Sequence, residues 1–200
     1  MVKANTRDTR ARVVDAAIVA FGGRGYDATS LDAVASELGI RKQTILYYFP
    51  SKEALLDAAI DRAAEDLSLT LEEALARAGQ GWDRVEAVVR SVFRLAARRP
   101  ELLGLIREVS RLGPPPTTRL TATLDPLIQR ATTFLESEMD VGAMRRHDPR
   151  LLLLAAYSTV IGVATEVEVM RALGYEPTAR SLVRRRAELL AFLRSALIPG

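Results

Sequence analysis

Apolar residues recur at helical spacing along almost the whole chain of 200 residues, and glycine or proline separates each such segment from the next. We find no segment with the alternation of apolar and polar residues that is typical of a strand. The sequence therefore predicts an all-α fold of about nine helices. They are expected at about residues 8–21, 30–38, 41–48, 52–78, 83–97, 101–111, 117–139, 149–173 and 178–197.

The composition excludes several kinds of chemistry. The chain has no cysteine and one histidine, His147, which lies in a polar segment that we expect to be a loop. Disulfides and thiolate metal sites are therefore excluded. Nucleophilic catalysis with a histidine base would depend on that loop residue. We expect no enzyme activity, no cofactor and no metal site.

Neither the start of the chain nor its most apolar run indicates a membrane segment. The first 12 residues are polar and lack the apolar stretch of a signal peptide. The run 151–164 is shorter than the roughly 18 residues that a membrane span needs. The formal net charge of +3 is a mild basic excess, which is compatible with a nucleic-acid partner. We therefore expect a cytoplasmic protein with no membrane contact.

Two short helices joined by a tight turn are the strongest local feature. Apolar residues at 31, 34, 35 and 38 form one face of the first helix, and Thr29 is its expected N-cap. Gly39 ends that helix, and Pro50 prevents the second helix from continuing. This is the spacing of a helix-turn-helix, in which the second helix enters the major groove of DNA.

The second of these helices carries the side chains that such a role needs. Its first residues can donate hydrogen bonds to base edges or phosphates, and its last turn offers phenolic hydroxyls to phosphate oxygens. An ordinary outward helix face would explain the basic residues equally well, but it explains two adjacent tyrosines beside them less well. The candidate DNA contacts from this pattern are Arg41, Lys42, Gln43, Thr44, Tyr47, Tyr48 and Lys52.

The same stretch resembles the amino-terminal domain of the tetracycline-repressor (TetR) family, a family of bacterial one-component transcriptional regulators. The resemblance rests on Gly25–Ser30, Val34-Ala35, Leu38-Gly39-Ile40 and Gln43–Leu55, and it covers about residues 7–60. The rest of the chain matches the family only in the number and length of its helices.

The resemblance implies roles for these residues. Family members approach base edges at the positions of Lys42, Gln43 and Thr44. They hold the phosphate backbone at the positions of Thr29, Tyr47, Tyr48 and Lys52. The chain departs from the family pattern at Leu46, where many members carry another tyrosine, and at Asp32, where some carry a basic residue. We interpret Asp32 as a helix-capping residue.

The resemblance also divides the chain. It implies a three-helix DNA-binding domain at 1–55 and a helical ligand-binding and dimerisation domain at 56–200. The long helix at 52–78 would connect the two domains.

Recognition by one short helix is weak, so a symmetric homodimer is expected to present two of them. The segment 149–173 carries a stripe of small residues, and the last helix has a broad apolar face. The resemblance implies that these helices pack with their symmetry mates as a four-helix bundle. The alternative is that the stripe packs inside one protomer. The expected interface residues are Ala155, Ser158, Gly162, Leu189 and Phe192.

A ligand cavity is implied by the resemblance alone. It would lie among the middle helices and hold a small, largely apolar inducer. Each candidate residue is individually more typical of plain core or surface than of a ligand contact. The candidates for the lining are Phe93, Ile106, Phe134 and Tyr157, with Arg107, Glu108 or Glu166 as polar anchors.

Two further basic clusters are less specific. Arg7, Arg10 and Arg12 either reach a neighbouring minor groove or form a solvated tail. The run 184–186 is three arginines, which we expect to be solvated or paired with nearby glutamates.

Together these features predict a sequence-specific DNA-binding transcriptional regulator. We expect a homodimeric repressor that a small apolar ligand releases from its double-stranded operator. The alternatives are a helical DNA-binding dimer without an inducer and a helical adaptor that binds protein.

Overall fold

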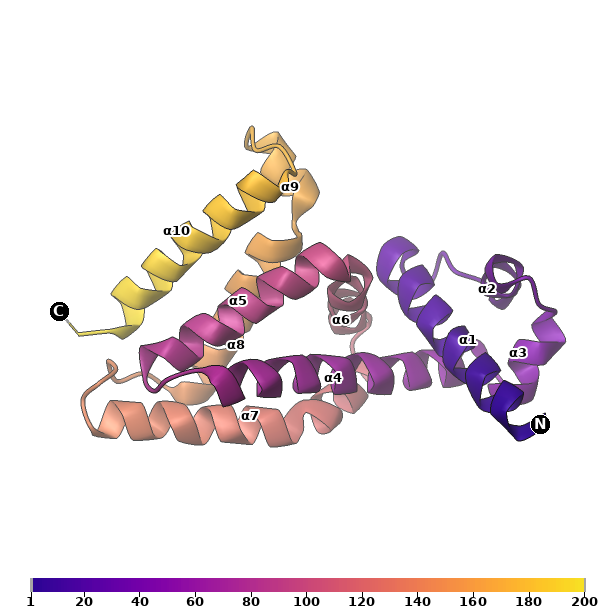
Figure 1. The fold of residues 1–200 in the computed structure, drawn as a ribbon, viewed down its shortest axis with the longest axis horizontal. Helices are drawn as coiled ribbons and strands as arrows, with labels where there is room; N and C mark the ends of the chain where they lie inside the picture. Colours follow the sequence, from indigo (N-terminus) through magenta and orange to yellow (C-terminus); the bar gives the residue numbers. More distant parts are fainter. Residues whose placement is uncertain (1, 200) are drawn as a thin grey trace. The chain divides into compact units, whose positions relative to one another are not determined.

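The computed structural model describes residues 2–199, with side chains described for residues 8–199. Within this range the chain forms helices and no strand, so the all-α prediction is confirmed (Figure 1). The helices are α1 (Val2–Arg24), α2 (Leu31–Leu38), α3 (Lys42–Tyr48), α4 (Lys52–Arg77), α5 (Trp82–Arg98), α6 (Pro100–Leu112), α7 (Pro116–Asp140), α8 (Pro149–Thr165), α9 (Val167–Ala172) and α10 (Ala179–Leu197).

The described residues form one helix more than predicted, because the segment expected as a single helix at 149–173 is broken at Glu166. Glu166 leaves helical geometry, with φ −78° and ψ 68°. The carbonyl of Val163 would pair with the amide four residues later in a continuous helix. Here it accepts a hydrogen bond from Arg185 Nη1 of α10 at 2.7 Å.

Arg185 is therefore not the solvated residue that the sequence predicted. It is only 9% exposed, and this burial lowers the pKa of its guanidinium from the usual value.

The chain forms two compact units and passes from one to the other three times. Unit 1 comprises the described residues up to Leu67 together with Arg99–Leu124, and unit 2 comprises Ser68–Arg98 and the described residues from Asp125 onward. These units do not coincide with the predicted domains 1–55 and 56–200, because α6 packs on α1.

The core of unit 1 is built by the apolar faces of α1, α2 and α3. The predicted stripe of α1 is buried, and α2 and α3 pack against it and against each other. The buried side chains of these three helices include Val14, Ala17, Ile18, Phe21, Leu31, Val34, Ala35 and Ile45. Burial of this apolar surface holds the short α2 and α3, which are too short to be stable alone.

Helix α6 approaches α1 so closely that backbone meets backbone. A Cβ built on Gly22 would lie under 3.0 Å from the carbonyl oxygen of Glu101, and one built on Gly104 would lie under 3.0 Å from the carbonyl oxygen of Gly22. Only residues without a side chain permit this approach. The two glycines therefore explain why α6 belongs to the same compact unit as the helix-turn-helix.

Unit 2 has its own core, in which α5, α8 and α10 pack against one another. A second cluster of buried apolar residues is formed by Leu135, Met139 and Met144. Within the described residues, every helix is too short or too polar to cross a lipid bilayer.

Candidate nucleic-acid interface

The turn between α2 and α3 has the geometry of a helix-turn-helix. Gly39 adopts the left-handed conformation with φ 66°, which favours glycine. Its amide donates to the carbonyl of Ser36 at 3.1 Å, and the amide of Ile40 donates to the carbonyl of Ala35 at 3.0 Å. The end of α2 is therefore closed by backbone hydrogen bonds, and the predicted tight turn is confirmed.

Ser30 is the N-cap of α2, where the sequence predicted Thr29. The Ser30 hydroxyl accepts a hydrogen bond from the amide of Ala33 at 3.1 Å. Ser51 occupies the same place before α4, and its hydroxyl accepts from the amide of Ala54 at 3.1 Å. Both caps satisfy amides that the helix itself leaves without partners.

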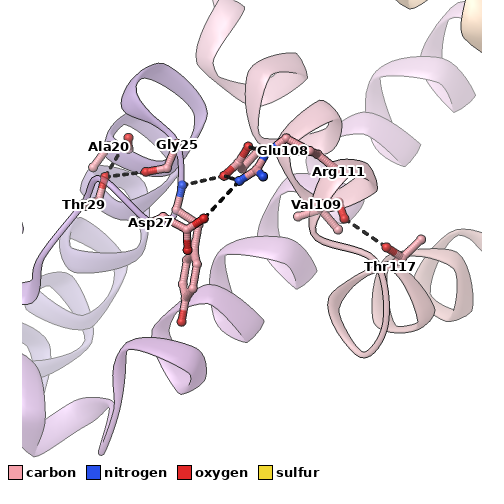
Figure 2. Close-up of polar contacts among 9 residues, drawn as sticks. Ala20, Gly25, Asp27, Thr29, Glu108, Val109, Arg111 and Thr117 are labelled. Carbon is pink, nitrogen blue, oxygen red and sulfur yellow. Dashed lines mark hydrogen bonds and ion pairs between the residues drawn. The ribbon is translucent and has the colours of Figure 1, made fainter.

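Thr29 is buried at the corner between α1 and α2, with only 2% of its surface exposed. Its hydroxyl lies 3.2 Å from the carbonyl oxygen of Ala20 and 2.8 Å from that of Gly25 (Figure 2). The side chain therefore holds this corner together. This contradicts the predicted phosphate contact at Thr29, because the hydroxyl is already engaged inside the protein and the residue is almost fully buried.

Helix α3 packs against the protein with one face and exposes the opposite face to solvent. Ile45 is fully buried, whereas Arg41 and Gln43 are exposed. Lys42 donates to Asp32 of α2 at 2.8 Å, so Asp32 partners a predicted reading residue and does not cap α2. Both side chains of this ion pair are substantially exposed, so it is weak in water.

Two tyrosines extend this exposed face at the end of α3. The ring of Tyr47 meets that of Tyr48 edge to face, with 5.0 Å between the centroids. Tyr47 is 79% exposed, which is unusual for so large a ring. Its hydroxyl is therefore available to an acceptor outside the protein.

Lys52, at the start of α4, is held by an aromatic ring. Its Nζ lies 4.1 Å from the ring centroid of Tyr26, at which distance an ammonium is attracted by the ring. The Tyr26 hydroxyl donates to Glu53 Oε1 at 3.0 Å. Burial and the neighbouring Glu53 carboxylate raise the pKa of Tyr26 to about 12, so its phenol stays protonated. Tyr26 lies in the segment Gly25–Ser30 on which the family resemblance rests, but no pattern in the sequence assigns it a role.

The basic residues at the amino terminus are part of α1 and do not form an extended arm. Helix α1 begins at Val2. The guanidinium of Arg10 lies 5.0 Å from the ring centroid of Phe49, which places it against the end of the helix-turn-helix. The side chain of Arg7 lies outside the described side chains.

The predicted dimer residues divide into two groups. Ala155, Ser158 and Phe192 are exposed, and Phe192 has 61% of its surface accessible. Leu189 is only 5% exposed because α10 packs against α5 and α8 within its own unit. The prediction of Leu189 as an interface residue is therefore contradicted.

The predicted ligand-lining residues do not behave alike. Phe93 and Ile106 are almost fully buried, and Tyr157 is 39% exposed. Ile106 belongs to unit 1, whereas Phe93, Phe134 and Tyr157 belong to unit 2. Glu108, a predicted polar anchor for the ligand, instead accepts a hydrogen bond from the backbone of the α1–α2 corner. The cavity remains a prediction.

Residues 13–59, which contain α2, α3 and the buried stripe of α1, match the model of the bacterial regulatory proteins of the tetR family. This segment belongs to the TetR family. The matched range ends in the first turns of α4 and includes every predicted DNA contact.

Individual relatives are similar to this chain over part of their length. The HTH-type transcriptional repressor KstR of Mycolicibacterium smegmatis is 31% identical over 96 residues, which are 48% of this chain and 47% of KstR. The alignment thus spans about half the length of that relative.

Solved structures match the chain over nearly its whole length. A TetR transcriptional regulator from Chloroflexus aurantiacus has a TM-score of 0.77 and 25% identity, over 98% of this chain and 100% of that one. The transcriptional regulator FadR from Bacillus subtilis, in complex with stearoyl-CoA, has a TM-score of 0.76 over 93% and 98% of the two chains. Its identity is 20%, so it shows a common fold alone.

Proposed function

We propose that this TetR-family chain is a sequence-specific DNA-binding repressor that acts as a homodimer in the cytoplasm. We propose further that a small, largely apolar ligand releases it from its operator. The observation that carries the proposal is the exposed face of α3, on a helix-turn-helix whose opposite face is buried.

The exposed side chains divide by chemistry. Gln43 can donate and accept in one plane, which suits an adenine edge, and Arg41 suits a guanine edge. Tyr47 and Lys52 suit phosphate oxygens, which carry no sequence information. Lys42 can turn from Asp32 toward DNA at little cost in free energy, because both side chains of this ion pair are substantially exposed.

An exposed apolar surface on α8 and α10 supports the homodimer. Leu151 and Leu154 of α8 are 64% and 59% exposed, and their spacing places them on the same helix face as the small residues Ala155 and Ser158. Phe192 of α10 is similarly exposed. Exposed apolar side chains of this size are typical of a protein interface. We propose that a second copy of the chain covers them, because a twofold pair of reading helices needs such an interface.

The ligand proposal rests on the family and on the fold. The fold is shared with the FadR regulator, whose structure contains stearoyl-CoA. Among the sequence-derived candidates, Phe93, Phe134 and Tyr157 belong to unit 2, and Phe93 is the most buried of them. Release would follow if the ligand prefers a conformation whose reading helices do not match the spacing of the operator half-sites.

Selection of bound sequences from random DNA tests the proposal directly. The wild-type chain should enrich a twofold-symmetric site whose halves lie about 34–36 Å apart, or a multiple of that distance. The absence of any enriched sequence, together with no retention of duplex DNA at low salt, would refute the proposed function.

Two variants then test the division between residues that contact base edges and residues that contact phosphates. Gln43→Ala should weaken binding to the selected site by about 1–3 kcal/mol and relax its sequence preference. Lys52→Ala should weaken binding to all sequences. It should also reduce the slope of log K against log salt by about one per protomer, because one phosphate contact is lost. Identical behaviour of the two variants would contradict the division.

A further inference from the structure

We propose that Glu108 of α6 is a positioning residue for DNA binding, which acts through Tyr26 to hold Lys52 toward the phosphate backbone. The inference rests on the proposed function, because it gives α6 a part in the same DNA-binding site. All residues involved lie in unit 1.

The first link is between Glu108 and the backbone of the α1–α2 corner. Glu108 Oε1 accepts a hydrogen bond from the amide of Tyr26 at 2.7 Å (Figure 2). The Glu108 side chain is only 11% exposed. Gly25 makes room for it, because a Cβ at this residue would lie 3.3 Å from the same oxygen. A charged acceptor with little access to water makes a strong hydrogen bond to an amide.

Arg111 completes the carboxylate site. Its Nε and Nη2 donate to the two oxygens of Glu108, each at 2.9 Å. Its third contact, with Asp27 at 3.3 Å, joins two exposed side chains and contributes little. Arg111 therefore neutralises and orients Glu108, while the amide of Tyr26 is the contact that reaches the corner.

The second link runs through the Tyr26 side chain. The amide held by Glu108 and the ring beneath the Lys52 ammonium belong to one residue, so anchoring the backbone also places the ring. The Tyr26 hydroxyl is fixed by Glu53, and its ring packs 5.4 Å from the ring of Phe21. The Tyr26 ring beside the Lys52 ammonium is thus fixed by three contacts: at its backbone amide, at its hydroxyl and at the ring of Phe21.

The sign of the expected effect separates this inference from general electrostatics. Glu108 carries a negative charge, so its removal should strengthen binding to DNA if charge alone decides. Positioning predicts the opposite for Glu108→Ala, because Tyr26 loses its anchor and Lys52 loses its fixed place. Glu108→Gln removes the same charge but keeps a carbonyl oxygen for the Tyr26 amide, so it should retain most of the affinity.

The experiment measures binding of the full chain to a labelled duplex of random sequence, about three helical turns or 30 base pairs long. Fluorescence anisotropy is recorded across a salt series from about 50 to 200 mM. Glu108→Ala should weaken binding by about fivefold, or about 1 kcal/mol over two protomers, and should flatten the salt slope. In a Lys52→Ala background the same change should alter affinity by less than about twofold, because the residue through which it acts is gone.

Asp61→Ala is the matched control for charge. Asp61 of unit 1 also forms a two-pronged ion pair, with Arg119 of the same unit. Among the contacts of the described residues, none joins Asp61 to Tyr26. The Asp61→Ala variant should bind DNA at least as tightly as the wild type. The inference is overturned if Glu108→Ala behaves like Asp61→Ala, or if its effect persists undiminished in the Lys52→Ala background.

A second pair of variants covers the case in which Glu108→Ala does not fold, as judged by circular dichroism. Tyr26→Phe keeps the ring and should bind with the salt slope of the wild type. Tyr26→Leu removes the ring and should match Lys52→Ala, and wild-type binding by Tyr26→Leu would also overturn the inference. If the wild-type chain itself does not bind the duplex, the proposed function fails, and that outcome is distinct from all of these.

Discussion

The contact between α1 and α6 offers a pair of neighbouring glycines with opposite expected effects. Gly22 and Gly23 both lie in α1, one residue apart. A Cβ on Gly22 would collide with the backbone of Glu101 and come under 3.0 Å from the amide nitrogen of Leu105, whereas a Cβ on Gly23 would meet nothing within 4 Å. The change from glycine to alanine therefore adds the same methyl group to a crowded side and to an open side of one helix.

The magnitude follows from two terms. Alanine is favoured over glycine inside a helix by about 0.5–1 kcal/mol, and this term is shared by both variants. Overpacking adds a cost of about 1–3 kcal/mol at Gly22, and more where backbone must move, as it must here. Gly22→Ala should thus be less stable than Gly23→Ala by about 2 kcal/mol or more, while Gly23→Ala should match or exceed the wild type.

Native-state hydrogen exchange is the suitable assay, because a chain with two compact units need not unfold in one step. The free energy of opening is compared for peptides from α1 and, as an internal reference, from α10. Gly22→Ala should lose protection in α1 and α6 and keep it in α10. Equal protection of α1 in the two variants would refute the argument that the backbones of α1 and α6 touch at this glycine.

Three further outcomes are expected. Thr29→Val should cost about 1–3 kcal/mol of unfolding free energy, measured in urea, because the hydrogen bond that the Thr29 hydroxyl shares between the carbonyls of Ala20 and Gly25 is lost. The salt slope of DNA binding should stay unchanged, because the hydroxyl is engaged inside the protein. Hydrogen bonds from Arg111 and from the Tyr26 amide lower the pKa of Glu108 below 4.5, so the charged form stabilises the folded state. That stabilisation is complete above pH 4.5 and is lost as pH falls from there toward the folded pKa, and Glu108→Gln should flatten this part of the stability curve. Phe192→Glu should convert the proposed dimer to monomers in sedimentation velocity, because it places a charge in the proposed apolar interface. An unchanged dimer would place the interface elsewhere.

The helix-turn-helix could be predicted because its signals are local. Gly39 is needed by the left-handed end of α2, and Pro50 follows the end of α3. The apolar faces of α1 and α2 show helical spacing within one or two turns. Such features depend on residues a few positions apart, and the N-cap at Ser30 in place of Thr29 is an error of one residue, which is usual at helix ends.

The side chains around the site could be predicted only in part. Gln43 and Tyr47 are exposed, as a polar and an aromatic residue on the outer face of α3 should be. Thr29 and Leu189 were misplaced because their environments come from other helices. The hydroxyl of Thr29 meets a carbonyl of α1, and Leu189 is covered within unit 2.

The sequence by itself determined the helical class, the two short helices with their tight turn and the TetR-family character of residues 13–59, because hydrophobic period, turn residues and motif spacing are properties of short stretches of chain. Only the tertiary structure decided that α6 joins the DNA-binding unit and that Glu108 meets the amide of Tyr26. These two residues are 82 positions apart in the chain. Two glycines, unremarkable in sequence, allow the helices that carry them to touch, and that approach depends on three-dimensional packing that no local pattern encodes.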